Sequence, residues 1–205
     1  MGSDLSKCDT VLRPQHPPIV AIDSRFAMPY EISLLMREKF WNYDDFNIKD
    51  RINNTVYFKI HRTSAFSFSQ KKILLDYYGQ PVANFKHRTF DHSFDVYLGS
   101  SSDSIAFSIY PNNSFVGVKL SATIINQATR ARQTLYLRCD NALGMFIFNG
   151  HPKQGGQAIA RMEKVSFFGP DEYTLQVAPG VDLAMVVFMV LAYDEVRERQ
   201  QSSLA

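Results

Sequence analysis

The chain has 205 residues, of which 45% are hydrophobic, and its 22 basic and 20 acidic side chains give a formal net charge of +2 at pH 7. This composition is that of a globular protein with one sizeable core, and it predicts a single domain. Its two cysteines, Cys8 and Cys139, exclude a disulfide framework and a CxxC metal site.

The first 18 residues are predicted to be an extended or disordered lead-in, because residues 9–18 contain three prolines. Residues 1–8 (MGSDLSKC) match the N-myristoylation pattern, with Gly2 as the acceptor and Cys8 as a candidate for palmitoylation. One myristoyl chain binds a membrane only marginally, so stable attachment needs a second acyl group or a basic patch. The alternative is a chance match or a recombinant Met-Gly-Ser start. No secretory signal is recognisable, so a cytoplasmic location is predicted, at the periphery of the plasma membrane if the chain is acylated.

From residue 19 to residue 177 the chain is a succession of short apolar runs broken by Asn, Asp, Gly and Pro, which predicts antiparallel strands. Residues 31–39 have the composition of a helix, but Ile32, Leu34 and Met36 alternate with other residues, which favours a strand. Residues 46–60 and 73–85 each predict a hairpin. Further strands are expected at 94–98, 105–110, 115–120, 134–139, 145–148, 157–162 and 173–177, making about eleven or twelve.

Residues 183–193 (LAMVVFMVLAY) contain no charge and predict a helix that runs from an N-cap at Asp182 to about Arg197. A helix that is apolar on every side must be enclosed by protein or by lipid. A bilayer span needs roughly 20 apolar residues, and this run is shorter and closely bracketed by Asp182, Asp194 and Glu195. Enclosure by protein is therefore predicted, with a membrane hairpin or tail anchor as the alternative.

The strands remove their exposed edges most simply by closing on themselves, and a barrel of this size has a lumen that needs filling. The predicted fold is mainly β: a closed antiparallel barrel of about twelve strands around a central hydrophobic C-terminal helix. It occupies residues 19–200, residues 201–205 form a disordered tail, and a monomer is expected.

Several short motifs resemble the LURP-one-related family in their order and spacing. They are Asp45-Phe46, residues 56–60 (VYFKI), Asp76 with Gly79-Gln80-Pro81, residues 159–161 (IAR), residues 171–182 (DEYTLQVAPGVD) and Asp194-Glu195. The resemblance runs from about residue 19 to residue 199. It implies the tubby C-terminal-like fold, shared with tubby proteins and phospholipid scramblases, and thus a twelve-stranded barrel around a helix. It implies no agreed biochemical activity.

No catalytic motif is present in the sequence. The closest approach to a metal-ligand cluster is His87 and His92, which flank Asp91. Five residues apart on an extended chain, the two histidines would point to opposite faces unless a turn intervenes. We therefore expect no enzymatic turnover, no metal and no cofactor.

Basic residues are concentrated in two parts of the chain, so the folded protein could present a basic face to an anionic partner. Tubby-type domains bind phosphoinositide headgroups through basic side chains on the outside of the barrel, and the resemblance implies an anionic phospholipid or phosphoinositide as partner. The predicted lipid-binding residues are Lys71, Lys72, Lys86, Arg88, Arg130 and Arg132. Scattered solvated charge is the alternative interpretation.

Phe85 and Phe90 lie among these basic residues, an arrangement that also occurs in proteins that bind single-stranded nucleic acid. Alternation in a barrel wall predicts instead that both side chains face the helix, so no nucleic-acid partner is expected. The predicted function is a non-catalytic module that binds anionic lipid. A protein-interaction adaptor or scaffold is the alternative, and scramblase-like lipid transport is disfavoured by the short helix.

Overall fold

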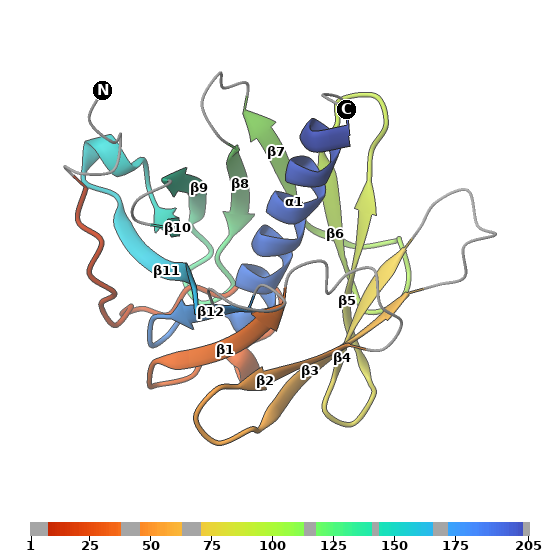
Figure 1. Ribbon diagram of the computed structural model, residues 1–205, viewed down its shortest axis with the longest axis horizontal. Coiled ribbons are helices and arrows are strands. Elements are labelled where there is room, and N and C mark those ends of the chain that lie inside the picture. The colour runs from red at the N-terminus through yellow and green to blue at the C-terminus, as the bar shows by residue number, and fades with distance from the viewer. Residues whose placement is uncertain are drawn as a thin grey trace.

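Twelve antiparallel strands form a closed barrel around one long helix in the computed structural model, which describes residues 8–37, 46–62, 71–112, 118–140, 144–165 and 172–202 (Figure 1). The strands are β1 (Ile32–Arg37), β2 (Phe46–Asp50), β3 (Val56–Arg62), β4 (Lys72–Asp76), β5 (Pro81–His87), β6 (Phe94–Leu98), β7 (Ile105–Asn112), β8 (Lys119–Ile125), β9 (Arg132–Asp140), β10 (Gly144–Asn149), β11 (Gln157–Lys164) and β12 (Glu172–Val177). The predicted fold is confirmed.

Each strand pairs with its neighbours in sequence, and β1 pairs with β12 from Ile32 opposite Val177 to Arg37 opposite Glu172, which closes the sheet. Closure leaves no strand edge open to pairing with another chain. Alternation along each strand sends one set of side chains inward. In β8, for example, Leu120, Ala122 and Ile124 are buried and the residues between them are not.

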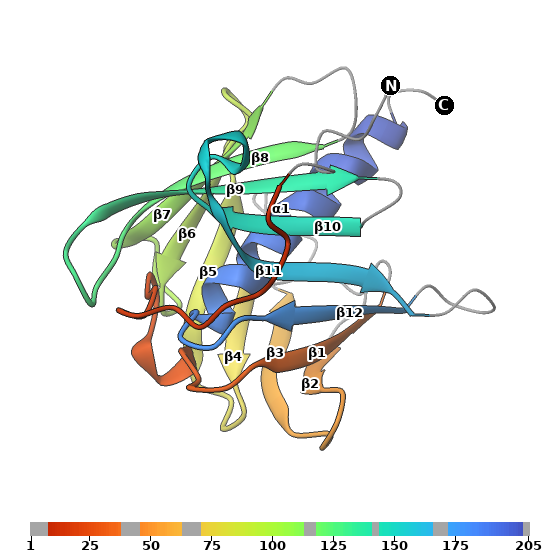
Figure 2. The same ribbon diagram turned by 90° about the vertical axis from the view of Figure 1, so that its left-hand side faces the viewer.

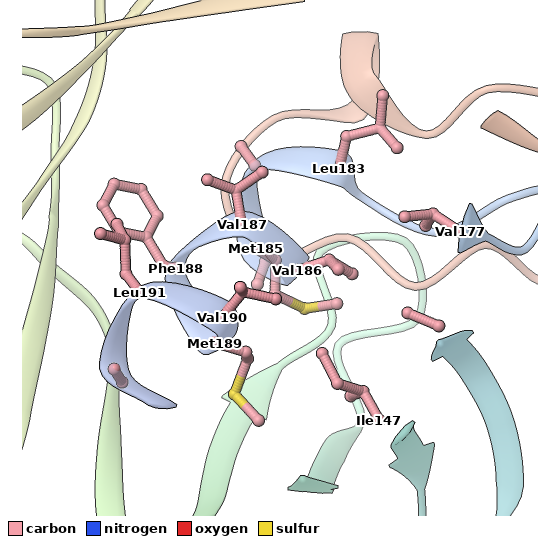
Figure 3. Close-up of a cluster of buried hydrophobic side chains, with 14 of the residues drawn as sticks. Ile147, Val177, Leu183, Met185, Val186, Val187, Phe188, Met189, Val190 and Leu191 are labelled. Atoms are coloured by element: carbon pink, nitrogen blue, oxygen red, sulfur yellow. The ribbon is translucent and has the colours of Figure 1, made fainter. Parts of the chain in front are cut away.

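The helix α1 (Leu183–Ser202) runs through the barrel and extends beyond the predicted end at about Arg197 (Figure 2). Every side chain from Leu183 to Ala192 is at most 1% exposed. The inward side chains of the strands surround these residues (Figure 3), and Phe188 stacks on Phe85 of β5 at 5.9 Å between ring centroids. The prediction that protein encloses the helix is thus confirmed. Within the described parts of the chain, no helix combines the length and apolarity needed to cross a membrane.

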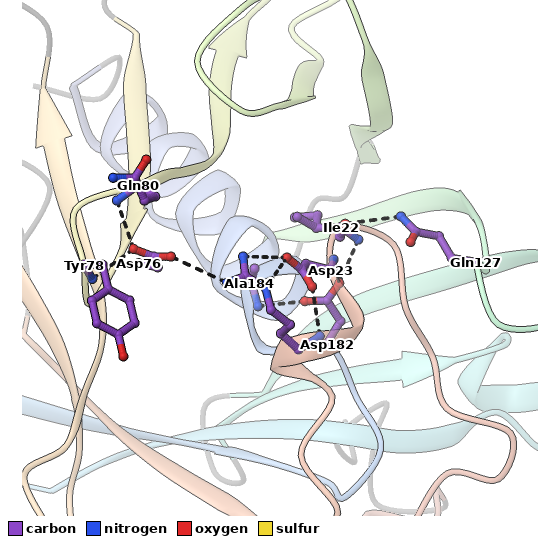
Figure 4. Close-up of polar contacts among 9 residues, drawn as sticks. Ile22, Asp23, Asp76, Tyr78, Gln80, Gln127, Asp182 and Ala184 are labelled. Carbon is purple, nitrogen blue, oxygen red and sulfur yellow. Dashed lines mark hydrogen bonds and ion pairs between the residues drawn. The ribbon is translucent and has the colours of Figure 1, made fainter.

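Asp182 joins the start of α1 to the N-terminal segment 19–27 (Figure 4). Its Oδ1 accepts hydrogen bonds from Ala184 N at 3.0 Å and Met185 N at 3.3 Å, which is the predicted N-cap. Its Oδ2 accepts three more, from the backbone N–H groups of Ala21 (3.2 Å), Ile22 (2.7 Å) and Asp23 (3.1 Å). Burial raises the pKa of Asp182 to about 6, and these hydrogen bonds oppose that shift.

Residues 8–18 of the lead-in also contact the barrel: they run along its outside and cross β10 and β11 (Figure 2). Gln15 N donates to Pro179 O at 2.9 Å. Cys8 and Leu12 pack on Phe146 and Phe148, two side chains of β10.

Candidate functional site

The two ends of α1 define two ends of the barrel, which we name the Asp182 end and the Arg199 end. Between these residues the helix rises about 25 Å at 1.5 Å per residue. Their surroundings differ, because the helix is uncharged from Leu183 to Tyr193 and carries charges of both signs from Asp194 to Arg199. Because the two ends are about 25 Å apart, side chains at one end cannot contact the same small ligand as side chains at the other.

Two of the predicted lipid-binding residues, Arg130 and Arg132, lie at the Asp182 end. Arg130 is in the turn between β8 and β9, and Arg132 is the first residue of β9; both are exposed. Asn126, in the same turn, accepts a hydrogen bond from Val20 N, in the segment that binds Asp182. This places the pair away from the other four predicted residues.

Lys72 faces the interior of the barrel. It is 7% exposed and lies opposite the inward-facing Phe85 in the β4–β5 register. Its ammonium group forms an ion pair with Glu195 of α1. Lys72 therefore links β4 to the helix and is not exposed for contact with a membrane.

The other three predicted residues gather on the outside of the barrel at the Arg199 end. Because Lys72 lies opposite Phe85, the residues on either side, Lys71 and Lys86, come next to each other on the outer face, where the Lys71 ammonium group donates a hydrogen bond to Ser100 O of the β6–β7 turn. Arg88 follows on the same side of β5. We name Lys71, Lys86 and Arg88 the β4–β5 basic patch.

Two carboxylates, those of Asp91 and Asp95, reduce the net positive charge of this patch. The Arg88 side chain is 48% exposed, with Nη2 3.6 Å from Asp91 Oδ2 and Nε 3.9 Å from Asp95 Oδ2. Asp95 is buried and lies opposite Lys86 in the β5–β6 register. It also accepts hydrogen bonds from Ser108 Oγ at 2.6 Å and Tyr97 Oη at 3.2 Å. These bonds fix the negative charge beneath the cations.

The turn between β5 and β6 determines where four side chains point. It reverses the chain after His87, which is the condition under which His87 and His92 were not expected on opposite faces, and their imidazole rings lie 6.1 Å apart. Phe85 faces the helix as predicted, whereas Phe90 is 99% exposed, so its predicted inward orientation is wrong. Continued alternation from Phe85 would itself place Phe90, five residues on, on the outer face, and β5 ends at His87, so the turn sets the direction of Phe90. The Asp91-His92-Ser93 sequence, typical of an Asx turn, was the available signal.

The inner side of this turn holds the end of α1. His87 Nε2 contacts Arg199 Nη1, and because arginine can only donate, this nitrogen must be the unprotonated acceptor. Arg199 Cζ also lies 5.7 Å from the centroid of the Phe94 ring, and Nη2 lies 3.3 Å from Glu195 Oε2. Burial, followed by the charge of Arg199, lowers the pKa of His87. Sequence reasoning missed this contact because its partners are far apart in the chain.

These contacts do not form a catalytic or metal-binding arrangement. His87 is held by a cation, whereas a general base is normally oriented by a carboxylate. Across the described residues, no group of three or more His, Cys, Asp or Glu side chains is placed to hold a metal ion. What the Arg199 end offers is charge and an exposed aromatic ring.

The two predicted lipidation residues have different outcomes. Gly2 lies outside the described residues. Cys8 is half-buried against the Phe146 and Phe148 cluster and is not part of a disulfide. Acylation of either residue stays a prediction.

Comparison with known proteins identifies relatives over nearly the whole barrel. The family model described as LURP-one-related matches residues 32–194. Protein LURP-one-related 15 of Arabidopsis thaliana is 22% identical over 198 residues, which cover 90% of this chain and 88% of the relative. Protein LURP-one-related 10 of the same plant is 25% identical over 195 residues, which cover 85% of this chain and 95% of the relative.

Proposed function

The chain belongs to the LURP-one-related family, and we propose that it is a non-catalytic binding module that attaches reversibly to anionic membranes by contacting lipid phosphates. Family membership assigns no ligand. The observation that supports the proposal is the β4–β5 basic patch, in which Lys71, Lys86 and Arg88 share one outer face at the Arg199 end. Arg130 and Arg132 lie at the other end and Lys72 faces inward, so the proposed contact is narrowed to these three.

The patch accounts for weak, salt-sensitive attachment. Each lysine or arginine near an anionic surface contributes about 1 kcal/mol, so three contribute about 3 kcal/mol before the opposing charges of Asp91 and Asp95 are considered. This attraction is screened over a Debye length of roughly 8–10 Å. A myristoyl chain at Gly2, if present, would add a contribution that salt does not weaken.

Vesicle sedimentation of unmodified protein tests the proposal. We expect binding to vesicles containing phosphatidylserine or a phosphoinositide, little binding to neutral phosphatidylcholine, and weaker binding at higher salt. Reversing two charges, Lys71→Glu with Lys86→Glu, should lower affinity at least about 30-fold, because it removes about 2 kcal/mol of attraction and adds repulsion.

The matched control is Arg130→Glu with Arg132→Glu, which changes the net charge equally at the Asp182 end. This control should bind nearly as well as the wild type. Equal binding to neutral and anionic vesicles, or equal losses from both double variants, would contradict attachment through the β4–β5 basic patch.

A second candidate function, protein-interaction adaptor, is favoured by a different surface. At the Asp182 end, Ile52 of the β2–β3 turn is 84% exposed, and Tyr77 and Tyr78 of the β4–β5 turn are 60% and 82% exposed. Apolar side chains gathered on adjacent turns are typical of protein contacts. Selective loss of a bound protein partner on Ile52→Ser with Tyr78→Ser would support this function. The enclosure of α1 gives no support to lipid transport by a membrane-spanning helix.

A further inference from the structure

Phe90 stands out among the described residues because its large apolar side chain is 99% exposed. It lies in the β5–β6 turn, beside the C-terminal part of α1 (Figure 1). The ring contributes nothing to the core, and leaving it in water is unfavourable. A surface that covers it would recover that free energy.

The turn holds Phe90 in a defined position. Arg88 N donates to Ser93 O at 2.8 Å, which closes the turn. Asp91 Oδ1 accepts from Ser93 N at 3.1 Å and from Ser93 Oγ at 2.7 Å. Because these bonds already order the backbone, Phe90 can enter a second phase with little further loss of conformational entropy.

Basic side chains surround the base of this turn. Lys86 and Arg88 precede Phe90 on the outer face, and Lys71, the residue before β4, lies beside Lys86. Arg199 contacts the inner side through His87. An anionic membrane has a layer of phosphates outside its hydrocarbon. If the turn points toward the membrane, the basic side chains at its base would lie at the level of the phosphates, and the Phe90 ring at its tip would reach the hydrocarbon boundary. The exposed β4–β5 turn at the Asp182 end has other basic neighbours: Lys59 Nζ lies 5.9 Å from the centroid of the Tyr77 ring, and Arg25 Nη1 lies 3.7 Å from Asp76 Oδ2.

We propose that the β5–β6 turn inserts Phe90 into the boundary between the headgroups and acyl chains of an anionic membrane. Lys71, Lys86 and Arg88 contact headgroup phosphates at the same time, so the barrel docks with its Arg199 end toward the bilayer. This inference rests on the proposed function and adds the element that enters the membrane.

The two contributions are separable by salt. Attraction between the cations and the lipid phosphates weakens as ionic strength rises, whereas burial of Phe90 does not. Phe90→Ala should therefore reduce affinity for phosphatidylserine vesicles about 10- to 100-fold, and the variant should lose nearly all remaining binding at high salt. Tyr78→Ala, which removes an exposed aromatic ring at the Asp182 end, is the matched control and should change affinity less than about twofold.

Fluorescence supplies a second measurement that does not depend on affinity. The chain has one tryptophan, Trp41, so Phe90→Trp is made in a Trp41→Phe background, with Tyr78→Trp in the same background as control. Vesicles should shift the emission of the residue-90 probe to shorter wavelength, and lipids brominated in their acyl chains should quench it. The residue-78 probe should show neither effect. Circular dichroism and thermal melting confirm that each variant is folded.

The outcomes distinguish the two proposals. If the wild type binds anionic vesicles in a salt-dependent way but Phe90→Ala binds equally well and the residue-90 probe is not quenched, the inference is wrong and the proposed function stands. If the wild type binds anionic vesicles no better than neutral ones, both are wrong. If both probes are quenched, the docking orientation is overturned.

Discussion

Replacing Asp182 by alanine tests whether one buried carboxylate joins the N-terminal segment to α1. The change removes the acceptor of five backbone hydrogen bonds, two at the helix start and three from residues 21–23. Loss of an N-cap costs about 1 kcal/mol. Each buried N–H left without a partner costs about 1–3 kcal/mol.

Removing the carboxylate also relieves a cost. Burial raises the pKa of Asp182 to about 6 from an ordinary 3.8, which corresponds to about 3 kcal/mol against the ionised form at pH 7. The expected net decrease in the free energy of unfolding is therefore about 4 kcal/mol. At about 2–4 °C per kcal/mol for a chain of this size, the melting temperature should fall about 8–16 °C.

Urea unfolding at pH 7, together with hydrogen exchange, measures this effect. The amides of residues 21–23 should exchange faster in Asp182→Ala than in the wild type. Asp182→Asn keeps one acceptor oxygen and should lose about half as much stability. The control is Asp23→Ala, which removes an exposed cap but leaves its own N–H in place and should cost about 1 kcal/mol or less. A loss below 1 kcal/mol for Asp182→Ala would refute the reasoning.

Three further predictions concern the apolar core, the close contact between Gly180 and Gln15, and the pH dependence of stability. Val187→Asp places an unpaired carboxylate inside the barrel at a cost of several kcal/mol out of a usual 5–15, so it should prevent folding; a soluble protein with a cooperative melt would contradict burial. Gly180→Ala should lower the urea midpoint, because Gly180 has φ +79° and a Cβ there would lie 2.5 Å from Gln15 O; an unchanged midpoint would show that the lead-in yields. The pKa of His87 is lowered in the folded protein, so the neutral side chain contributes to stability above pH 6.5, and this contribution is lost as the pH falls through the folded pKa. Protonated His87 would be repelled by Arg199 and His92, and the nearby Glu195 and Asp91 would offset part of this repulsion. His87→Gln should therefore lose less stability than the wild type between pH 7.5 and 5.5, and equal losses would exclude the effect.

The sequence determined the architecture because each of its signals is local. Alternation at Ile32, Leu34 and Met36 was enough to favour a strand over a helix, and β1 is a strand. The uncharged run 183–193 required an enclosure, and the many predicted strands could supply it by closing into a barrel. The opposite orientations of Lys71 and Lys72 were also within reach of the sequence, since Lys72 is in phase with the buried Leu74.

Only the tertiary structure decided which distant residues meet. Asp182 accepts three hydrogen bonds from residues about 160 positions earlier in the chain, and no local pattern encodes such a contact. The basic residues predicted as one set were divided between two ends of the barrel, because strand direction and register place each hairpin turn. Phe90 was assigned inward together with Phe85, although two residues five positions apart on one strand point to opposite faces. Phe90 also lies beyond the end of β5, in a turn whose backbone dihedral angles do not repeat every two residues.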